Sequence, residues 1–140
     1  MIKTECVFCK IARGVVNAKV VYEDETTLAF LDSQPVAEGH VLVIPKEHYV
    51  NLFDIEPRTL ERLILTTRRV ALLLRDRLHA NGINLFHRTG EAGEQTVYHF
   101  HIHVIPRKER DHINFNEWWA TKLVPIDESG FDSLVRKFQG

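Results

Sequence analysis

The sequence predicts an α+β fold, in which an antiparallel sheet of about five strands carries one long helix and shorter helices. Two observations lead to this class. Short runs rich in β-branched residues are joined by hairpin-like links, and a single long stretch between them has helical periodicity. The order of strands, one long helix and more strands is typical of an α+β domain with an antiparallel sheet.

The N-terminal half contains a short helix and three strands. Asp24-Glu25-Thr26 suits a hairpin turn, Gly14 ends the helix, and Pro45 stops the third strand. The expected elements are a helix at about Cys6–Arg13 and strands at Lys19–Glu23, Thr27–Leu31 and Val41–Ile44.

The strongest helical pattern runs from about Pro57 to Ala80. Pro57 suits the first turn, and Asn81-Gly82 provides the C-terminal stop. Arginines fall largely away from an apolar face that we expect to pack on the sheet. That face comprises Leu60, Leu63, Ile64, Ala71, Leu74 and Leu78.

Two more strands, Ile83–Phe86 and Tyr98–Ile105, are expected after the long helix. In the C-terminal tail, Trp118-Trp119 and Phe131–Phe138 are interpreted as a covering loop and a terminal helix. The chain contains no repeat and no low-complexity stretch, so we expect residues 1–140 to form a single domain.

Composition excludes several classes of function. The 140 residues are 44% hydrophobic, and the formal net charge of −1 argues against a broad electrostatic grip on nucleic acid. No apolar run approaches the ~20 residues that cross a bilayer, so no membrane association is expected. The first six residues lack the apolar stretch of a secretory signal, which favours a cytoplasmic location.

The only two cysteines stand together as Cys6-Val7-Phe8-Cys9. The loop between them is too short for a useful disulfide staple, and a reducing compartment disfavours one. Three interpretations remain: a redox pair, two buried unpartnered thiols, or half of a zinc site. Zinc needs four ligands, and histidines would have to complete the set because no second Cys-x-x-Cys exists.

Three of the eight histidines alternate with apolar residues in His99-Phe100-His101-Ile102-His103-Val104. In a strand, the imidazoles would project from one face, roughly 6 to 7 Å apart, while the apolar residues enter the core. Two chemistries are possible: a catalytic metal bound by two or three imidazoles, or a neutral imidazole that attacks phosphorus. The second needs a phosphate-binding group, which the preceding loop Gly90–Thr96 could supply.

With these residues in place, the sequence resembles the histidine triad (HIT) family. The family signature His-φ-His-φ-His-φ-φ, in which φ is apolar, matches His99–Ile105, and Gln95-Thr96-Val97-Tyr98 precedes it. The resemblance covers about residues 6–107 and leaves the tail, 108–140, unassigned. It extends to Cys6–Ile11, Val21–Asp24, Ala29–Asp32 and Gly39–His48.

The resemblance implies a hydrolase that cleaves at the α-phosphate of purine nucleotide conjugates through a covalent nucleotidyl-histidine. The conjugates are of the nucleoside phosphoramidate, acyl-nucleotide or dinucleoside polyphosphate type. His101 resembles the nucleophile, His103 the histidine that assists the leaving group, and His40 a supporting histidine. The alternatives are a nucleotidyltransferase or phosphorylase, and a nucleotide-binding signalling or scaffold protein with residual turnover.

The resemblance also implies binding residues, a structural zinc ion and a homodimer. Val70, Leu72 and Leu73 lie off the main helix face and would suit burial against a second copy. The zinc ligands would be Cys6, Cys9, His48 and His99. The nucleotide would contact Asp32 through its ribose, Phe8, Phe30 and Leu31 through its base, and Gln95, Thr96 and Arg88 near its phosphate.

Two positions depart from the phosphoramidase branch of the family. Glu94 replaces a glycine and Arg88 replaces an asparagine, so the carboxylate of Glu94 must point away from the phosphate or meet a cation such as Arg88. His79, His87 and His112 match no functional position, and we interpret them as surface residues.

Overall fold

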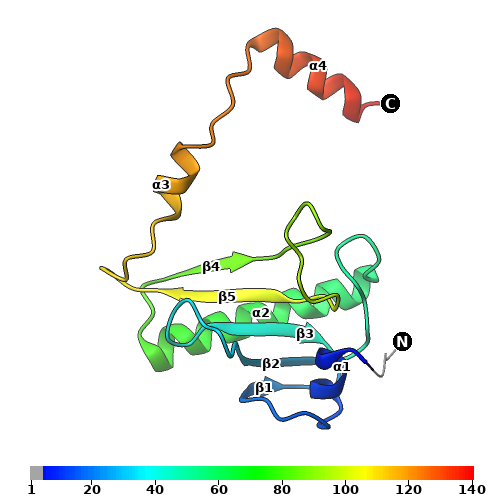
Figure 1. The fold of residues 1–140 in the computed structure, drawn as a ribbon, viewed down its shortest axis with the longest axis vertical. Coiled ribbons are helices and arrows are strands. Elements are labelled where there is room, and N and C mark those ends of the chain that lie inside the picture. Colours follow the sequence, from blue (N-terminus) through cyan, green and yellow to red (C-terminus); the bar gives the residue numbers. More distant parts are fainter. Residues whose placement is uncertain (1–4) are drawn as a thin grey trace.

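The computed structural model describes residues 5–140 and confirms the predicted α+β class. Its five strands form one sheet in the order β1-β2-β3-β5-β4, and each pair of neighbours is antiparallel. Helix α2 lies across one face of the sheet. Helix α1 lies at the end of the sheet where β2 begins and β3 ends (Figure 1). The bounds are α1 Val7–Ala12, β1 Val20–Glu23, β2 Thr27–Leu31, β3 Val41–Pro45, α2 Pro57–Leu78, β4 Gly82–Phe86 and β5 Ile102–Arg107. Residues 1–4, part of the stretch considered above for a secretory signal, lie outside the described residues.

Strands β2 and β3 lie in the interior of the sheet and are buried on both faces, which explains their continuous apolar sequences. All five residues of β3 are buried, as are the first four of β2. Alternate side chains of these strands enter two clusters. Ala29, Val41 and Val43 pack with α2, whereas Phe30 and Leu42 pack with Phe8 and other residues of α1.

Helix α2 buries a face that is rotated from the predicted one. Leu63 and Leu74 are buried as expected, but Ile64 is 46% exposed. Val70 is 1% exposed and lies in the core, so its expected place in a dimer interface is wrong. The buried face includes Thr66 and Thr67. The prediction used apolar residues only, so it left these two threonines out of the core and placed the buried face incorrectly.

Strand β5 begins at Ile102 instead of Tyr98, so two of the three histidines precede it. The main-chain N–H of Phe100 donates to the carbonyl of Tyr49 at 2.7 Å, which attaches this segment to the loop after β3. Phe100 is nevertheless buried in the α2-side core, and the ring centroids of His101 and His103 lie 5.1 Å apart. The alternation of polar and apolar residues therefore survives without a regular strand.

The tail forms two helices, α3 (Phe115–Ala120) and α4 (Glu128–Phe138), that extend away from the sheet (Figure 1). The terminal helix confirms the prediction. The prediction of a covering loop is wrong, because Trp118 and Trp119 belong to α3 and are 58% and 65% exposed. None of the helices in residues 5–140 is both long and apolar enough to cross a membrane.

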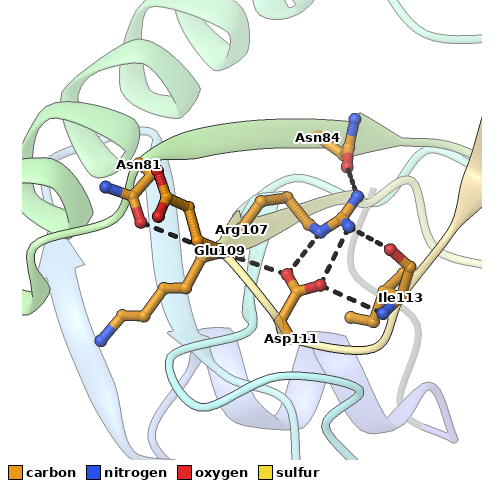
Figure 2. A network of polar contacts seen from close by, with 7 residues as sticks. Asn81, Asn84, Arg107, Glu109, Asp111 and Ile113 are labelled. Carbon is orange, nitrogen blue, oxygen red and sulfur yellow. Dashed lines mark hydrogen bonds and ion pairs between the residues drawn. The ribbon is translucent and has the colours of Figure 1, made fainter.

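A network around Arg107 holds the start of the tail in place (Figure 2). Its guanidinium donates to both carboxylate oxygens of Asp111, at 2.7 and 3.0 Å, and to Asn84 of β4 at 2.8 Å. The same guanidinium donates to the carbonyl of Ile113. The hydrogen bonds from Arg107 hold the pKa of Asp111 well below its ordinary value of 3.8. The direction in which the tail leaves is thus set by specific contacts.

Candidate active site and metal site

His40 and His103 form a hydrogen-bonded pair at the centre of the candidate active site. His40 immediately precedes β3, and His103 lies in β5 opposite Leu42, so the pairing of these strands brings the two rings together. His40 Nε2 lies 2.8 Å from His103 Nδ1. Both residues are buried, and burial lowers the pKa of His40 below 6.5 and that of His103 to about 4. Both rings are therefore neutral near pH 7.

The hydrogen-bond partners determine where the protons of this pair reside. The main-chain N–H of Val36 can only donate, and it donates to His40 Nδ1 at 3.2 Å. The proton of a neutral His40 is then on Nε2 and is donated to His103 Nδ1. His103 consequently carries its proton on Nε2, a buried atom with no partner among residues 5–140. This N–H is available to an oxygen or nitrogen of a bound ligand.

His101 is held so that its Nε2 carries no proton. Its Nδ1 lies 2.7 Å from the carbonyl oxygen of His99, and a carbonyl only accepts, so Nδ1 bears the proton. Burial lowers the pKa of His101 and favours the neutral ring. The ring contacts Phe8 edge-to-face, with centroids 5.3 Å apart. Nε2 of His101 thus offers a lone pair, which is what a nucleophilic imidazole requires.

Asp32 follows β2 and faces the histidine pair. Its Oδ2 lies 3.5 Å from His40 Nε2 and 3.8 Å from His103 Nδ1, and its side chain is 18% exposed. These three residues bring one ligand atom each within 4.8 Å of one another. The facing nitrogens of His40 and His103 are already bonded to each other, however, which does not favour the catalytic-metal alternative.

A second cluster joins α1, the loop after β3 and the segment before β5. Cys6, Cys9, His48 and His99 each offer a ligand atom, and all four atoms lie within 4.8 Å of one another. His99 Nε2 donates to the carbonyl of Pro45 at 2.8 Å, which leaves the lone pair of Nδ1 facing the thiols. His99 Nδ1 lies 3.4 Å from Cys6 Sγ, and His48 Nδ1 lies 3.3 Å from Cys9 Sγ.

This donor set fits zinc. Tetrahedral zinc with sulfur and nitrogen ligands places neighbouring donor atoms about 3.3–3.8 Å apart. The two thiol–imidazole separations above fall in that range. The distance between His48 Nδ1 and His99 Nδ1 is 3.2 Å, just below it. Two thiolates and two imidazoles make a closed site of the structural kind. The zinc interpretation of Cys-x-x-Cys is thereby favoured over a redox pair, because each thiol faces an imidazole.

The buried side chain of Gln95 holds the loop before the triad through hydrogen bonds to main-chain groups. Its Nε2 donates to the carbonyls of Val50 and Val97 at 2.7 and 3.1 Å, and its Oε1 accepts from the N–H of Gly90 at 2.9 Å. The side chain is 5% exposed. Thr96, by contrast, is exposed at the surface.

Glu94 and Arg88 meet through the main chain. Arg88 Nη1 donates to the carbonyl of Glu94 at 3.1 Å and its guanidinium lies over the ring of Phe86. Glu94 is exposed and has φ 64°, the left-handed region that glycine adopts more readily. A glycine in the phosphoramidase branch would occupy this position without strain.

Of the remaining predicted binding residues, Phe8 contacts the His101 ring and Phe30 packs against Phe8. Phe8 and Phe30 are 7% and 4% exposed and pack edge-to-face, with ring centroids 5.5 Å apart. Leu31, at the end of β2, is 40% exposed.

His87 is the site residue that the sequence interpretation missed. It is partly buried, unlike the exposed His79 and His112, and its Nδ1 lies 2.9 Å from the carbonyl of His101. A single histidine at the end of a strand has no distinguishing pattern, so no signal in the sequence marked it.

The architecture is that of solved histidine triad proteins. A zinc-bound histidine triad family protein from Mycobacterium smegmatis superposes with a TM-score of 0.76 at 44% identity, covering 79% of this chain and 81% of that one. A HIT family protein from Bacillus anthracis superposes with a TM-score of 0.82 at 31% identity, covering 97% and 96%.

Sequence comparison leads to the same class. The HIT domain model matches residues 13–110. The protein named hit of Bacillus subtilis is 38% identical over 135 residues, 94% of this chain and 92% of its own. Adenylylsulfatase HINT3 of Arabidopsis thaliana is 37% identical over 138 residues, 97% of this chain and 70% of its own. The chain belongs to the HIT family, which supports a nucleotide-binding, hydrolase-type role and a zinc ion in the Cys6/Cys9/His48/His99 site.

Proposed function

We propose that the protein hydrolyses purine nucleotide conjugates at the α-phosphate through a covalent nucleotidyl-His101. The conjugates are nucleoside phosphoramidates, acyl-nucleotides or dinucleoside polyphosphates. One observation carries the proposal: a neutral imidazole with its Nδ1–H on the carbonyl of His99 lies beside His103, whose Nε2–H is without a partner among the described residues. A relative named an adenylylsulfatase supports hydrolysis at an adenylyl group.

In the first step, the lone pair of His101 Nε2 attacks the α-phosphorus. A nitrogen–phosphorus bond forms, the bond to the leaving group breaks, and the leaving group takes the bonding electron pair. The His99 carbonyl stabilises the positive charge that develops on the His101 ring, because it already accepts the Nδ1–H. The Nε2–H of His103 donates to the phosphoryl or leaving-group atom on which negative charge grows.

In the second step, water attacks the phosphorus and gives up a proton, which balances the proton that the leaving group takes up on departure. At the same time the nitrogen–phosphorus bond breaks. Its electron pair returns to His101 Nε2, and a nucleoside monophosphate leaves. His40 keeps His103 in the required tautomer throughout by donating from Nε2.

For the nucleotide, we keep the residue roles that the family resemblance implies. Asp32 would bind the ribose hydroxyls, and Phe8, Phe30 and Leu31 would line the base site. Gln95 would act by holding the loop, while Thr96 and Arg88 would contact the phosphate side.

When bound, a zinc ion would supply rigidity at a site separate from the reacting imidazoles. Cys6, Cys9, His48 and His99 would hold it, and its binding would fix α1 against the segment that carries His101.

The covalent step is tested by incubating adenosine phosphoramidate with the protein and searching for an AMP adduct by denaturing mass spectrometry. We expect the adduct on His101, its loss in His101→Ala, and its retention in the matched control His79→Ala, which removes an exposed histidine. An adduct on another residue, or full hydrolysis by His101→Ala, contradicts the mechanism.

We also propose that the protein is a cytoplasmic homodimer. Apolar side chains are exposed on the tail, on edge strand β4 and on α2, and a second copy would bury them. They include Trp118, Trp119, Phe131, Phe138, Leu85, Phe86, Ile64 and Leu65. Sedimentation equilibrium tests the dimer, and a monomer at micromolar concentration contradicts it. Fractionation of cells tests the location.

A further inference from the structure

His87 lies directly behind the histidine that the proposed reaction uses as nucleophile. It is the first residue after β4, and its partly buried ring stacks on Phe100, with centroids 4.4 Å apart and an interplanar angle of 24°. Phe100 is 1% exposed, so the stacked ring of His87 is held against a rigid part of the core.

A one-way series of hydrogen bonds passes through His87. The main-chain N–H of Leu52 donates to Thr89 Oγ1 at 3.1 Å, and Thr89 Oγ1 is bonded to His87 Nε2. His87 Nδ1 is bonded to the carbonyl of His101 at 2.9 Å. Because an amide only donates and a carbonyl only accepts, a neutral His87 must donate from Nδ1 and accept the Thr89 hydroxyl at Nε2. Every group in the series is then satisfied.

This series ends at a segment that lacks the support of a regular strand. His101 precedes the first residue of β5, and the described β4–β5 pairing ends with Phe86 opposite His103. The His101 carbonyl is therefore held by the side chain of His87. The ring of His101 is held separately, through its own Nδ1–H on the carbonyl of His99.

We propose that His87 is a positioning residue for His101. By holding the carbonyl of His101, it aligns the Nε2 lone pair of that residue for attack on phosphorus, and Thr89 in turn holds His87. The inference rests on the proposed function, since it concerns the same nucleophile. His87 bonds the main-chain carbonyl of His101 through its side chain, so we expect it to act on the chemical step and not on substrate binding.

Three substitutions separate this role from simple packing. His87→Phe keeps a ring against Phe100 but removes both nitrogens. His87→Asn places an amide N–H where Nδ1–H now lies, and Thr89→Val removes the hydroxyl that holds His87. His79→Asn is the matched control, because His79 is exposed and asparagine tolerates its positive φ.

We expect His87→Phe to lower kcat for adenosine phosphoramidate about tenfold or more, with KM within about twofold of wild type. His87→Asn should recover kcat to within about threefold of wild type, Thr89→Val should fall between the two, and His79→Asn should be unchanged. The proposal is overturned if His87→Phe retains kcat within twofold of wild type, or if His87→Asn is no better than His87→Phe.

A second measurement does not depend on turnover. In imidazole ¹⁵N–¹H spectra of the free protein, the His101 Nδ1–H signal should shift in His87→Phe and stay near its wild-type position in His87→Asn. An unmoved signal in a folded His87→Phe protein overturns the positioning role. A wild-type protein without hydrolytic activity would refute the proposed function instead, and the spectra would still decide the role of His87.

Discussion

Protonation of His103 should destabilise the folded protein as the pH falls. Burial lowers the pKa of His103 from 6.5 to about 4 in the folded protein, whereas the unfolded chain has the ordinary value. Between these two pH values the unfolded chain binds more protons, so acid favours unfolding. A group with a depressed folded pKa thus stabilises fully above about pH 6.5, and that stabilisation is lost as the pH approaches 4.

The size of the effect follows from the same two values. One pKa unit corresponds to 1.36 kcal/mol, so a pKa of about 4 in place of 6.5 is equivalent to about 3 kcal/mol. The side chain of His103 is only 10% exposed, so solvent screening reduces this figure little.

The assay compares wild type with His103→Asn by urea denaturation at about pH 7 and at about pH 4. Asparagine cannot be protonated, and its Oδ1 can accept the hydrogen bond from His40 Nε2. We expect the free energy of unfolding of wild type to fall about 3 kcal/mol further than that of His103→Asn. Both proteins keep the same zinc ligands, so acid release of zinc contributes equally and cancels in the difference.

A control and a direct titration make the test decisive. His79→Asn should follow wild type at both pH values, because His79 is exposed. If wild type and His103→Asn lose equal stability over this range, or if His103 titrates near pH 6.5 by NMR, burial does not keep the ring neutral and the reasoning is wrong.

Three further predictions concern the zinc site, the loop and the core. Cys9→Ser should reduce zinc from about one ion per chain and lower Tm, measured by elemental analysis and calorimetry; equal zinc content in variant and wild type would contradict the site. Glu94→Gly should raise the free energy of unfolding by about 0.5–1 kcal/mol by relieving the positive φ, while Glu91→Gly in the same turn should lower it; a loss of stability in Glu94→Gly would refute the strain argument. Leu63→Ala, at a side chain that is 0% exposed, should cost about 2–5 kcal/mol in urea denaturation, and Glu61→Ala, at an exposed position of the same helix, about 0.5 kcal/mol or less; similar losses would place the buried face of α2 wrongly.

Most of the elements could be predicted because their signals are local. The apolar run at Val41–Pro45 and the periodicity of Pro57–Leu78 each involve neighbours along the chain, and both elements form within two residues of the predicted bounds. The start of β5 was missed because the main-chain N–H of Phe100 pairs with Tyr49, a partner from the loop after β3. The rotated face of α2 was missed because threonine is polar by composition and buried only by context.

The candidate site divides in the same way. The sequence by itself determined which residue types stand at the alternating positions, and the family resemblance connected Cys6, Cys9, His48 and His99 as one ligand set. Only the tertiary structure decided the protonated nitrogen of each ring, the role of His87 and the outward course of the tail. The physical reason is that a neutral imidazole places its proton according to its hydrogen-bond partners, and these partners are set by packing between segments distant in the chain, as with His40 and His103.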